Sequence, residues 1–361
     1  MFRKLIGTLL LFLSLTSVFS QKQQNETYDR AILNDGPFIF IKQNKLVQKE
    51  IINGIVSTKE LPLNSIKTRF SPEPSTYTNV KKIAALSDIH GQYDLALELL
   101  VNNKIIDKNY NWRFGKGHLV IAGDIFDRGP KVHETLLLIY KLEQQAKKKG
   151  GRVHFLLGNH EYMVLHNDLR YIHKKYRLTS RLLKINYAEL YGKNTVLGRW
   201  LRSKATILKI NKDYFVHGGV SKDFISKTAF SSNSIHNINN MMRTSIDISK
   251  KTLKTTDFYK TYYGPKSLIW YRGYFYDHLK EEEISTIFQL LDSKHMIVGH
   301  CSNKEVVQLF DHKIFGVDSS LKYGEYGELL LIKRNKYRRK SLKGRTKKFS
   351  KNTIEKQTDS K

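Results

Sequence analysis

The sequence predicts an α/β domain whose functional residues lie where its strands end. Three observations support this prediction. Short apolar runs recur between residues 81 and 300, and each one stops at a polar residue or a glycine, as buried strands do. Helical patterns separate several of these runs, and alternating strands and helices are typical of α/β domains. Acids, amides and imidazoles end the runs, and ligands of α/β sheets collect at the carboxyl ends of the strands.

The composition is that of a folded protein with a strongly basic surface. The chain has 361 residues, 40% hydrophobic and 11% aromatic, which suffices for the core of one large or two small domains. The formal net charge of +29 predicts adhesion to anionic surfaces such as nucleic acid, phospholipid or acidic polymers, without indicating specific recognition. Cys301 is the single cysteine, so no intramolecular disulfide can form.

Residues 1–20 are predicted to be a signal peptide. A basic start and an apolar stretch from Leu5 to Val18 precede short side chains and a cleavage point after Ser20. The alternative is an uncleaved anchor, but the apolar stretch is short for a membrane-spanning helix. We therefore expect an exported, periplasmic or secreted chain that begins at Gln21.

The rest of the chain divides into three predicted parts. Residues 21–80 contain strand-like runs such as "PFIFIKQNKLV" and are expected to form an N-terminal extension packed on the main domain. Residues 81–332 are expected to form the main domain, and the protein is expected to be a monomer. Residues 333–361 are cationic with almost no apolar content, which predicts a disordered tail. This tail is either a solvated, solubilising segment or one that contacts polyanions.

Five predicted strands carry the pattern of the main domain, in the order "KIAALSD", "HLVIAGD", "VHFLLGN", "DYFVHGG" and "HMIVGH". Between the second and third, "KVHETLLLIYKLEQQAKKK" has the apolar spacing of an amphipathic helix, and Pro130 suits its start. Residues 162–192 are predicted to be a basic, helical insertion between two strands.

The ends of these strands hold residues of the types that bind metal ions. In chain order they are Asp88, His90, Asp124, Asp127, Arg128, Asn159, His160, His217 and His300. One histidine at a strand end is more often structural than functional. Five strand ends that each carry such residues, at the edge where α/β sheets bind ligands, together indicate one shared site. Carboxylate, amide and imidazole ligands together suit divalent Mn, Fe or Zn. Six of these residues are candidate metal ligands, namely Asp88, His90, Asp124, Asn159, His217 and His300. Six ligands are too many for one tetrahedral site and fit two ions that share a carboxylate.

These blocks resemble a known family. "SDIHG", "GDIFDRG", "GNHE", "HGG" and a late "GH" are similar to the motifs of the calcineurin-like metallophosphoesterases, specifically the phosphoprotein phosphatase superfamily. "NDLRYIHKKY", "LGRWLRSK" and "LIWYRGY" resemble its bacterial, Shewanella-like branch. The resemblance spans about residues 81–325 and implies a four-layer α-β-β-α sandwich with a di-metal site at the carboxyl ends of the strands. Two departures are Ser87 in place of the first glycine, and "GVDSSLKYGEYG" in place of a C-terminal Ser-Ala-Pro-Asn-Tyr segment.

The resemblance also implies a metal ligand set. One metal would be bound by Asp88, His90 and His300, the other by Asn159 and His217, and Asp124 would bridge the two. Two divalent transition-metal ions per chain, Mn, Fe or Zn, are therefore expected as cofactors.

The remaining residues would act on the substrate. By the same resemblance, His160 would be the general acid that protonates the leaving oxygen, positioned by Asp127. Arg128 and Arg272 would bind the substrate phosphate, and Asn159 would contact it as well. This agrees with the chemistry, since a guanidinium presents a planar fork to phosphate oxygens and an alkoxide leaving group needs a proton.

The expected function is that of an exported phosphomonoesterase acting on a phosphoprotein, a phosphopeptide or a small phosphate ester, with hydroxide from a metal-bound water attacking phosphorus. In phosphoproteins the target would be Ser/Thr or Tyr. One alternative is a dinucleoside polyphosphate hydrolase or nucleotidase, although the symmetrical dinucleoside tetraphosphate hydrolases usually lack the pair formed here by Asp127 and Arg128 and have Asp at the position of Glu161. Another alternative is a polyanion-binding protein on an inactive phosphatase scaffold. Such a scaffold should have lost ligands, and all six are present.

Several tempting residues are not assigned to the site. Five histidines fall within strand or helix patterns and are expected to be structural or on the surface, namely His118, His133, His154, His166 and His173. Cys301 lies next to a proposed ligand, but no base is predicted beside it, so we do not expect it to act as a nucleophile.

Overall fold

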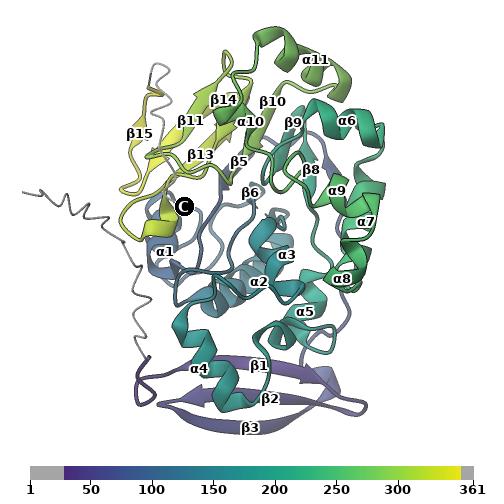
Figure 1. The fold of residues 1–361 in the computed structure, drawn as a ribbon. Helices are drawn as coiled ribbons and strands as arrows, with labels where there is room; N and C mark the ends of the chain where they lie inside the picture. Colours follow the sequence, from purple (N-terminus) through teal and green to yellow (C-terminus); the bar gives the residue numbers. More distant parts are fainter. Residues whose placement is uncertain (1–27, 351–361) are drawn as a thin grey trace, which may run out of the picture.

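The computed structural model describes residues 28–350 (Figure 1). Two six-stranded sheets form its centre, and a separate three-stranded sheet lies at one end. The predicted signal peptide, residues 1–20, lies outside the described residues. No helix between residues 28 and 350 combines the length and the apolar character needed to cross a membrane.

The first large sheet, the β5 sheet, has the strand order β15-β14-β13-β5-β6-β7. Its strands are β5 (Lys82–Leu86), β6 (His118–Ile121), β7 (Arg152–Phe155), β13 (Glu328–Lys333), β14 (Lys336–Ser341) and β15 (Thr346–Lys347). Strands β5, β6 and β7 run parallel, whereas β13, β14 and β15 add to the β5 edge in antiparallel fashion.

The second large sheet, the β9 sheet, has the order β11-β12-β10-β9-β8-β4. Its strands are β4 (Thr76–Tyr77), β8 (Ile207–Ile210), β9 (Asp213–Val216), β10 (His295–Val298), β11 (Val307–Leu309) and β12 (Ile314–Gly316). Strands β9, β10 and β12 run parallel. Each large sheet therefore has a parallel centre whose carboxyl edge can carry a ligand site.

Helices cover the outer faces of both sheets (Figure 1). They are α1 (Tyr93–Asn102), α2 (Val132–Lys148), α3 (Asn159–Leu165), α4 (Lys174–Leu183), α5 (Val196–Leu201), α6 (Lys222–Thr228), α7 (Ile235–Ser245), α8 (Lys250–Leu253), α9 (Asp257–Tyr262), α10 (Gly273–Tyr276) and α11 (Glu281–Leu291). Short 3₁₀ helices occur at η1 (Leu63–Ser65), η2 (Tyr187–Tyr191) and η3 (Leu321–Tyr323). Helix α2 packs against β7, and α7 packs against β8.

The alternation of side chains along β5 shows how the layers are built. Ile83 and Ala85 belong to an apolar cluster that joins the two large sheets, and this cluster also contains Phe215 of β9 and Ile297 of β10. Residues 84 and 86 point the other way, into the larger cluster that includes the helices. Successive strand side chains point to opposite faces, so one strand serves both interfaces. The predicted fold class, an α/β sandwich with two central sheets, is confirmed.

The five strands expected from the apolar runs are all present, as β5, β6, β7, β9 and β10. The amphipathic pattern after Pro130 forms α2, which begins at Val132. The predicted helical insertion, residues 162–192, contains most of α3, all of α4 and the short helix η2.

The prediction of a disordered tail from residue 333 is wrong for the described part of that segment. Strands β14 and β15 continue the β5 sheet to Lys347, so the main domain does not end at 332. Strand β14 can join the sheet despite its positive charge because its arginine at position 339 is neutralised. The Arg339 side chain is buried, and its guanidinium contacts Glu328 at 2.8 Å and Glu305 at 2.7 Å. Buried charges are tolerated when they are paired and hydrogen-bonded. Residues 351–361 lie outside the described residues.

The predicted N-terminal extension contains a sheet of its own. Strands β1 (Asp35–Ile41), β2 (Lys45–Ile52) and β3 (Ile55–Pro62) form an antiparallel meander. Strand β1 packs against α2 and α5, with the ring of Phe38 4.2 Å from that of His133. However, β4 also falls within residues 21–80 and belongs to the β9 sheet, so the predicted domain boundary at residue 80 is too late.

Candidate active site

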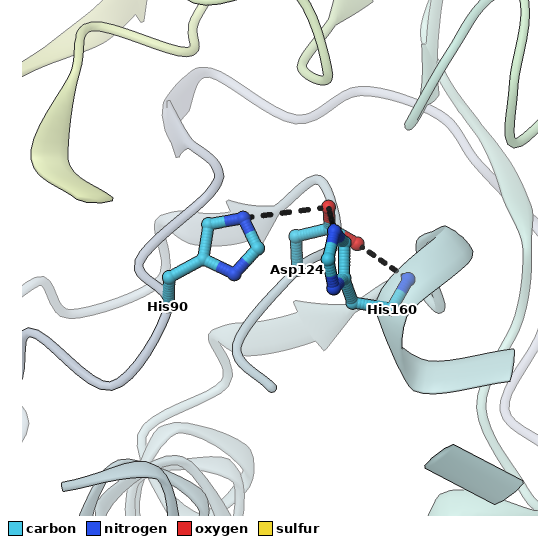
Figure 2. A group of neighbouring side chains, drawn as sticks. All are labelled: His90, Asp124 and His160. Atoms are coloured by element: carbon cyan, nitrogen blue, oxygen red, sulfur yellow. Dashed lines mark hydrogen bonds and ion pairs between the residues drawn. The ribbon is translucent and has the colours of Figure 1, made fainter. Parts of the chain in front are cut away.

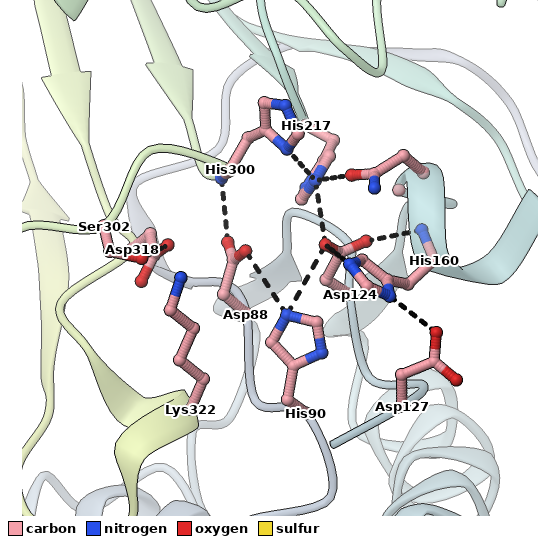
Figure 3. Close-up of polar contacts among 12 residues, drawn as sticks. Asp88, His90, Asp124, Asp127, His160, His217, His300, Ser302, Asp318 and Lys322 are labelled. Carbon is pink, nitrogen blue, oxygen red and sulfur yellow. Dashed lines mark hydrogen bonds and ion pairs between the residues drawn. The ribbon is translucent and has the colours of Figure 1, made fainter. Parts of the chain in front are cut away.

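The strand-end residues come together at the carboxyl edges of both large sheets, and Figure 3 shows seven of them side by side, namely Asp88, His90, Asp124, Asp127, His160, His217 and His300. Strands β5, β6 and β7 contribute from one sheet, and β9 and β10 contribute from the other. The site therefore lies where the two large sheets meet, at the carboxyl ends of their strands, as the resemblance implies.

Asp124 lies at the centre of the cluster. Its Oδ2 atom is 3.6 Å from Nε2 of His90, 3.9 Å from Nε2 of His160 and 3.1 Å from Nε2 of His217. The rings of His90 and His160 lie side by side, with their centres 4.7 Å apart, and the backbone N–H of His160 donates to Oδ1 of Asp124 at 3.1 Å (Figure 2). Asp124 is only 1% exposed, so its charge must be compensated by groups within the protein or by a bound cation.

The surroundings of His217 fit a bound cation. Its Nδ1 lies 2.8 Å from the backbone oxygen of Ala122, so in the neutral ring, the form that binds a metal, Nδ1 carries the hydrogen and Nε2 presents a lone pair. That Nε2 atom faces Oδ1 of Asn159 at 2.8 Å, Oδ2 of Asp124 at 3.1 Å and Nδ1 of His300 at 3.1 Å. These four atoms can all offer lone pairs to a cation, and Nε2 of His300 is buried without a hydrogen-bond partner among residues 28–350. Such a donor set suits a divalent transition metal.

A second group of acceptors lies around His90. Its Nδ1 donates to the backbone oxygen of Phe126 at 2.6 Å, which directs Nε2 towards the carboxylates. Nε2 is 3.8 Å from Oδ1 of Asp88 and 3.6 Å from Oδ2 of Asp124. Asp124 is thus shared between the two groups, as the resemblance implies for a bridging ligand.

The expected position of His300 needs correction. The resemblance groups it with Asp88 and His90, but its ring lies beside His217, and a ligand group forms from Asp124, His217 and His300. The register of the β9 sheet is the reason. Val216 of β9 pairs with Val298 of β10, so the residues that follow these two parallel strands emerge side by side. Only the backbone N–H of His300 contacts Asp88, donating to Oδ2 at 2.9 Å.

The protonation states show how strongly these groups interact. Burial, together with the nearby charge of Asp318, raises the pKa of Asp88 to about 7. Burial opposes protonation of His217, but the carboxylates of Asp124 and Asp88 outweigh it and raise the pKa of His217 to about 9. The pKa of Asp124 lies well below its usual range, because the positive imidazoles of His217 and His160 outweigh the effect of burial. The cluster therefore requires positive charge at its centre.

The loops that carry these side chains are strained. Positive φ angles occur at six of the site residues, namely Asp88 (54°), His90 (46°), Asp124 (60°), Asp127 (70°), Arg128 (67°) and His300 (67°). The left-handed region is uncommon outside glycine and costs roughly 1 kcal/mol or more per residue. Two glycines allow the close packing beneath: a Cβ on Gly158 would lie 2.2 Å from Oδ1 of Asp124, and one on Gly123 would lie 2.6 Å from Nδ1 of His217.

His160 and Asp127 form the expected pair. Nδ1 of His160 lies 2.6 Å from Oδ2 of Asp127, and Nε2 points towards Asp124 (Figure 3). Burial alone would lower the pKa of His160, but the carboxylates of Asp124 and Asp127 raise it above its usual value. The ring of Tyr171 lies 5.4 Å from that of His160. His160 is thus held with one ring nitrogen free to face a substrate.

The two arginines differ in their settings. Arg128 is exposed, and its guanidinium lies 5.8 Å from the centre of the Tyr171 ring. Arg272 precedes α10 and donates from Nη1 to the backbone oxygen of His300 at 3.2 Å. Arg128 therefore borders the cluster from the loop after β6, and Arg272 borders it through its contact with His300, which follows β10.

Two important carboxylates were given no role in the site by the sequence analysis. Glu161 is fully buried and accepts the backbone N–H groups of Asp124, Ile125, Phe126 and Gly158. Its only signal was its place in the "GNHE" block. Asp318 is also fully buried, beside Asp88 and near Lys322 (Figure 3).

Asp318 had a recognisable signal. It follows β12 after one residue, just as the other site acids follow their strands, and it accepts hydrogen bonds from Oγ of Ser302 at 2.6 Å and the N–H of Ser320 at 3.2 Å. A sixth strand ending in "GVDSS" could have been added to the five.

The residues left out of the site lie away from it or lack the geometry for chemistry. His118 and His154 contact each other at 2.9 Å, and His133 contacts the backbone oxygen of Pro37 at 3.1 Å. His166 pairs with a tyrosine hydroxyl, and His173 caps α4. Cys301 is buried, and burial raises the pKa of its thiol to about 12, so it is no nucleophile.

Comparison with known proteins agrees with this geometry. Residues 81–301 match the sequence profile described as calcineurin-like phosphoesterase, and they include every residue of the cluster. The chain belongs to the calcineurin-like phosphoesterase family. As a member of that family it is a metal-dependent phosphoesterase, and its aspartate and histidine groups could hold divalent metal.

Relatives of this calcineurin-like phosphoesterase are phosphatases by name. A "Shewanella-like protein phosphatase 1" from Plasmodium berghei is 28% identical over 268 residues, which cover 70% of this chain and 71% of that one. The solved structure of a cold-active protein-tyrosine phosphatase from a psychrophilic Shewanella is 40% identical, with a TM-score of 0.82 over 87% of this chain and 98% of that one. A symmetrical bis(5'-nucleosyl)-tetraphosphatase from Wigglesworthia glossinidia brevipalpis is 31% identical over 140 residues, 37% of this chain and 43% of that one. The predicted family and the Shewanella-like branch are confirmed, and the chain is a phosphatase.

Proposed function

We propose that this phosphatase is a di-metal phosphomonoesterase that acts on phosphoproteins or phosphopeptides. The observation that carries the proposal is the position of His160, which is held by Asp127 on one side and faces the Asp124 cluster with its free nitrogen. A proton donor beside a metal cluster is the arrangement that an ester with a basic leaving group needs.

Two divalent ions, Mn, Fe or Zn, would be held by the two groups of acceptors that share Asp124. Asp88 and His90 would bind one ion, and Asn159, His217 and His300 would bind the other. When bound, such ions lower the pKa of a coordinated water and offset charge on the phosphoryl group. Support for two ions comes from two groups of possible ligands that share Asp124, one with His90 and His160 and the other with His217 and His300.

The chain's own groups then act on the substrate. His160 holds its proton at Nε2, since Nδ1–H is engaged by Asp127, and donates it to the departing oxygen. Arg128 and Arg272 bind terminal phosphate oxygens through their planar guanidinium groups. A monoester presents three terminal oxygens and a diester only two, so two arginines in addition to the metal ligands favour monoesters.

The names of the relatives support a protein or peptide substrate. The Plasmodium relative is called a protein phosphatase, and the Shewanella structure is that of a protein-tyrosine phosphatase. The alternative function is that of a dinucleoside polyphosphate hydrolase, and the shorter match to a tetraphosphatase supports it.

The test is an activity profile of metal-stripped protein after reconstitution with Mn, Fe or Zn. The panel holds phosphoserine, phosphothreonine and phosphotyrosine peptides, a dinucleoside polyphosphate and a phosphate diester. We expect at least one phosphopeptide to give the highest kcat/KM, and metal analysis to give about two ions per chain. The highest kcat/KM on the dinucleotide or the diester would overturn the substrate assignment, and one ion per fully active chain would overturn the di-metal assignment.

We further propose that the protein is exported after cleavage of residues 1–20, on the basis of the basic start and apolar stretch in the sequence. Intact-mass measurement of the protein from a native-like host should give a chain that begins near Gln21. A full-length, membrane-bound product would favour an uncleaved anchor.

A further inference from the structure

A cavity of about 350 Å³ lies outside the active site, between edges of the two large sheets. Strand β7 is the edge of the β5 sheet, and β4 is the edge of the β9 sheet. Side chains of both strands line the cavity, together with residues of α2 and of the strap formed by residues 67–74. None of the catalytic or metal-binding residues lines it. Its volume is that of a site for a small organic molecule.

Aromatic side chains form much of its wall. Phe70 packs edge-on against Tyr140 with ring centres 6.0 Å apart, and Tyr140 packs in the same way against Trp200 at 5.8 Å. Phe155 and Tyr77 also line the cavity. Walls of this kind favour a ligand with a flat, apolar ring.

The charges around the cavity are unbalanced. Five lining side chains are basic and two are acidic. The two acids are already paired, Glu73 with Lys147 at 2.9 Å and Glu143 with Lys204 at 2.6 Å. The three remaining basic residues are Lys67, Lys148 and Arg152; the two lysines are exposed, and Arg152 lies near enough to Glu73 to lower the pKa of that carboxyl. The cavity therefore carries an excess of positive charge.

Two buried polar atoms of the wall also lack a well-aligned hydrogen bond. Within the described residues these are Nε of Arg152 and Oη of Tyr77, although the guanidinium lies close to the Tyr77 hydroxyl, and Nη1 of Arg152 donates to the backbone oxygen of Gly151 at 2.8 Å. Burial raises the pKa of Tyr77 to about 12, so its hydroxyl keeps its hydrogen. A buried donor without a well-aligned acceptor destabilises the fold, and the oxygens of an anionic ligand would supply that acceptor.

From these features we infer that the cavity binds a small aromatic carboxylate. Its ring would lie among Phe70, Tyr140 and Trp200, and its carboxylate would accept hydrogen bonds from Arg152 and Tyr77. The site is separate from the proposed catalytic one. Arg152 is the first residue of β7, whereas Asn159 lies beyond the last.

The test compares two probes of equal size, 2-naphthoate and neutral 2-naphthamide, by isothermal titration calorimetry on the full mature chain. We expect 2-naphthoate to bind with a stoichiometry of one, and 2-naphthamide to bind at least tenfold more weakly. Arg152→Met should weaken 2-naphthoate at least tenfold, and Tyr77→Phe, which keeps the aromatic wall, should weaken it severalfold. The matched control is Arg113→Met, an exposed arginine outside the cavity, which should change the affinity less than twofold.

Activity on p-nitrophenyl phosphate, measured without the probe, should be unchanged in all three variants, which shows that each is folded. No saturable binding of 2-naphthoate, equal binding of 2-naphthamide, or equal losses in Arg152→Met and Arg113→Met would each overturn the inference. None of these results depends on the substrate of the catalytic site.

Discussion

Glu161 holds the central loop of the active site in place, and its replacement by glutamine tests that role. Its two carboxylate oxygens accept four backbone N–H groups. Oε2 accepts those of Asp124 at 2.8 Å and Gly158 at 2.7 Å, and Oε1 accepts those of Ile125 at 2.7 Å and Phe126 at 3.1 Å. Glutamine keeps the shape but replaces one oxygen by an NH₂ group, which cannot accept.

The size of the effect follows from the number of bonds lost. Whichever way the amide of Glu161→Gln turns, two buried N–H groups lose their acceptor. Each such loss costs about 1–3 kcal/mol, so the change amounts to roughly 2–6 kcal/mol. This is a large part of the ~5–15 kcal/mol that stabilises an ordinary domain. Because the loop carries Asp124 and Asp127, it should rearrange and release metal ligands from their positions.

Three measurements check this expectation. Urea unfolding should show a loss of about 2 kcal/mol or more, elemental analysis should show fewer metal ions per chain, and kcat/KM on p-nitrophenyl phosphate should fall at least tenfold. Glu328→Gln is the matched control, because Glu328 is also fully buried and accepts the N–H of Val306 at 3.0 Å and the guanidinium of Arg339. It lies in the β5 sheet at β13, so it should lower stability without changing metal content.

The reasoning would be refuted if Glu161→Gln lost stability like Glu328→Gln but kept the metal content and kcat/KM of the wild type. Glu161 would then support the fold without positioning the site.

Four further predictions concern the site and the core. His160→Ala should lower kcat/KM far more for phosphoserine than for an aryl phosphate, whose leaving group needs no proton; equal losses would contradict the role of general acid. Arg128→Ala and Arg272→Ala should each cost an aryl monoester about 1.5–3 kcal/mol in kcat/KM and cost its diester less, and even losses on the two would argue against phosphate binding by these arginines. Asp124→Asn should abolish both metal occupancy and turnover, as judged by elemental analysis and assay, whereas an active, metal-free variant would disprove the bridging role. Burial lowers the pKa of His133 to about 4, so between pH 6.5 and 4.5 the unfolded chain takes up a proton that the folded chain does not. The free energy of unfolding should therefore fall on acidification, and the fall should be roughly 2–3 kcal/mol smaller in His133→Gln. Urea unfolding of both proteins at pH 6.5 and 4.5 measures this difference, and the same fall in both proteins would contradict the prediction.

Most of the site could be predicted from the sequence because its residues follow their strands directly. A buried strand is visible as an apolar run, and the residue after it must lie at the carboxyl edge of the sheet. Asp124 and His217 are found in this way, and the "GNHE" block places His160 beside Asn159. These relations are local along the chain, so no knowledge of strand pairing is needed.

Other features depend on contacts between distant segments, and only the tertiary structure decided them. His300 joins His217 because β9 and β10 pair in a particular register, which no local pattern encodes. The basic tail becomes strand β14 because Arg339 meets Glu328 and Glu305, and its charge alone had predicted disorder. The sequence thus determined which polar residues lie at the strand ends, since strand ends are marked by local changes in polarity. The fold decided which of them share a ligand and which charges are compensated, since both depend on the pairing of segments far apart in the chain.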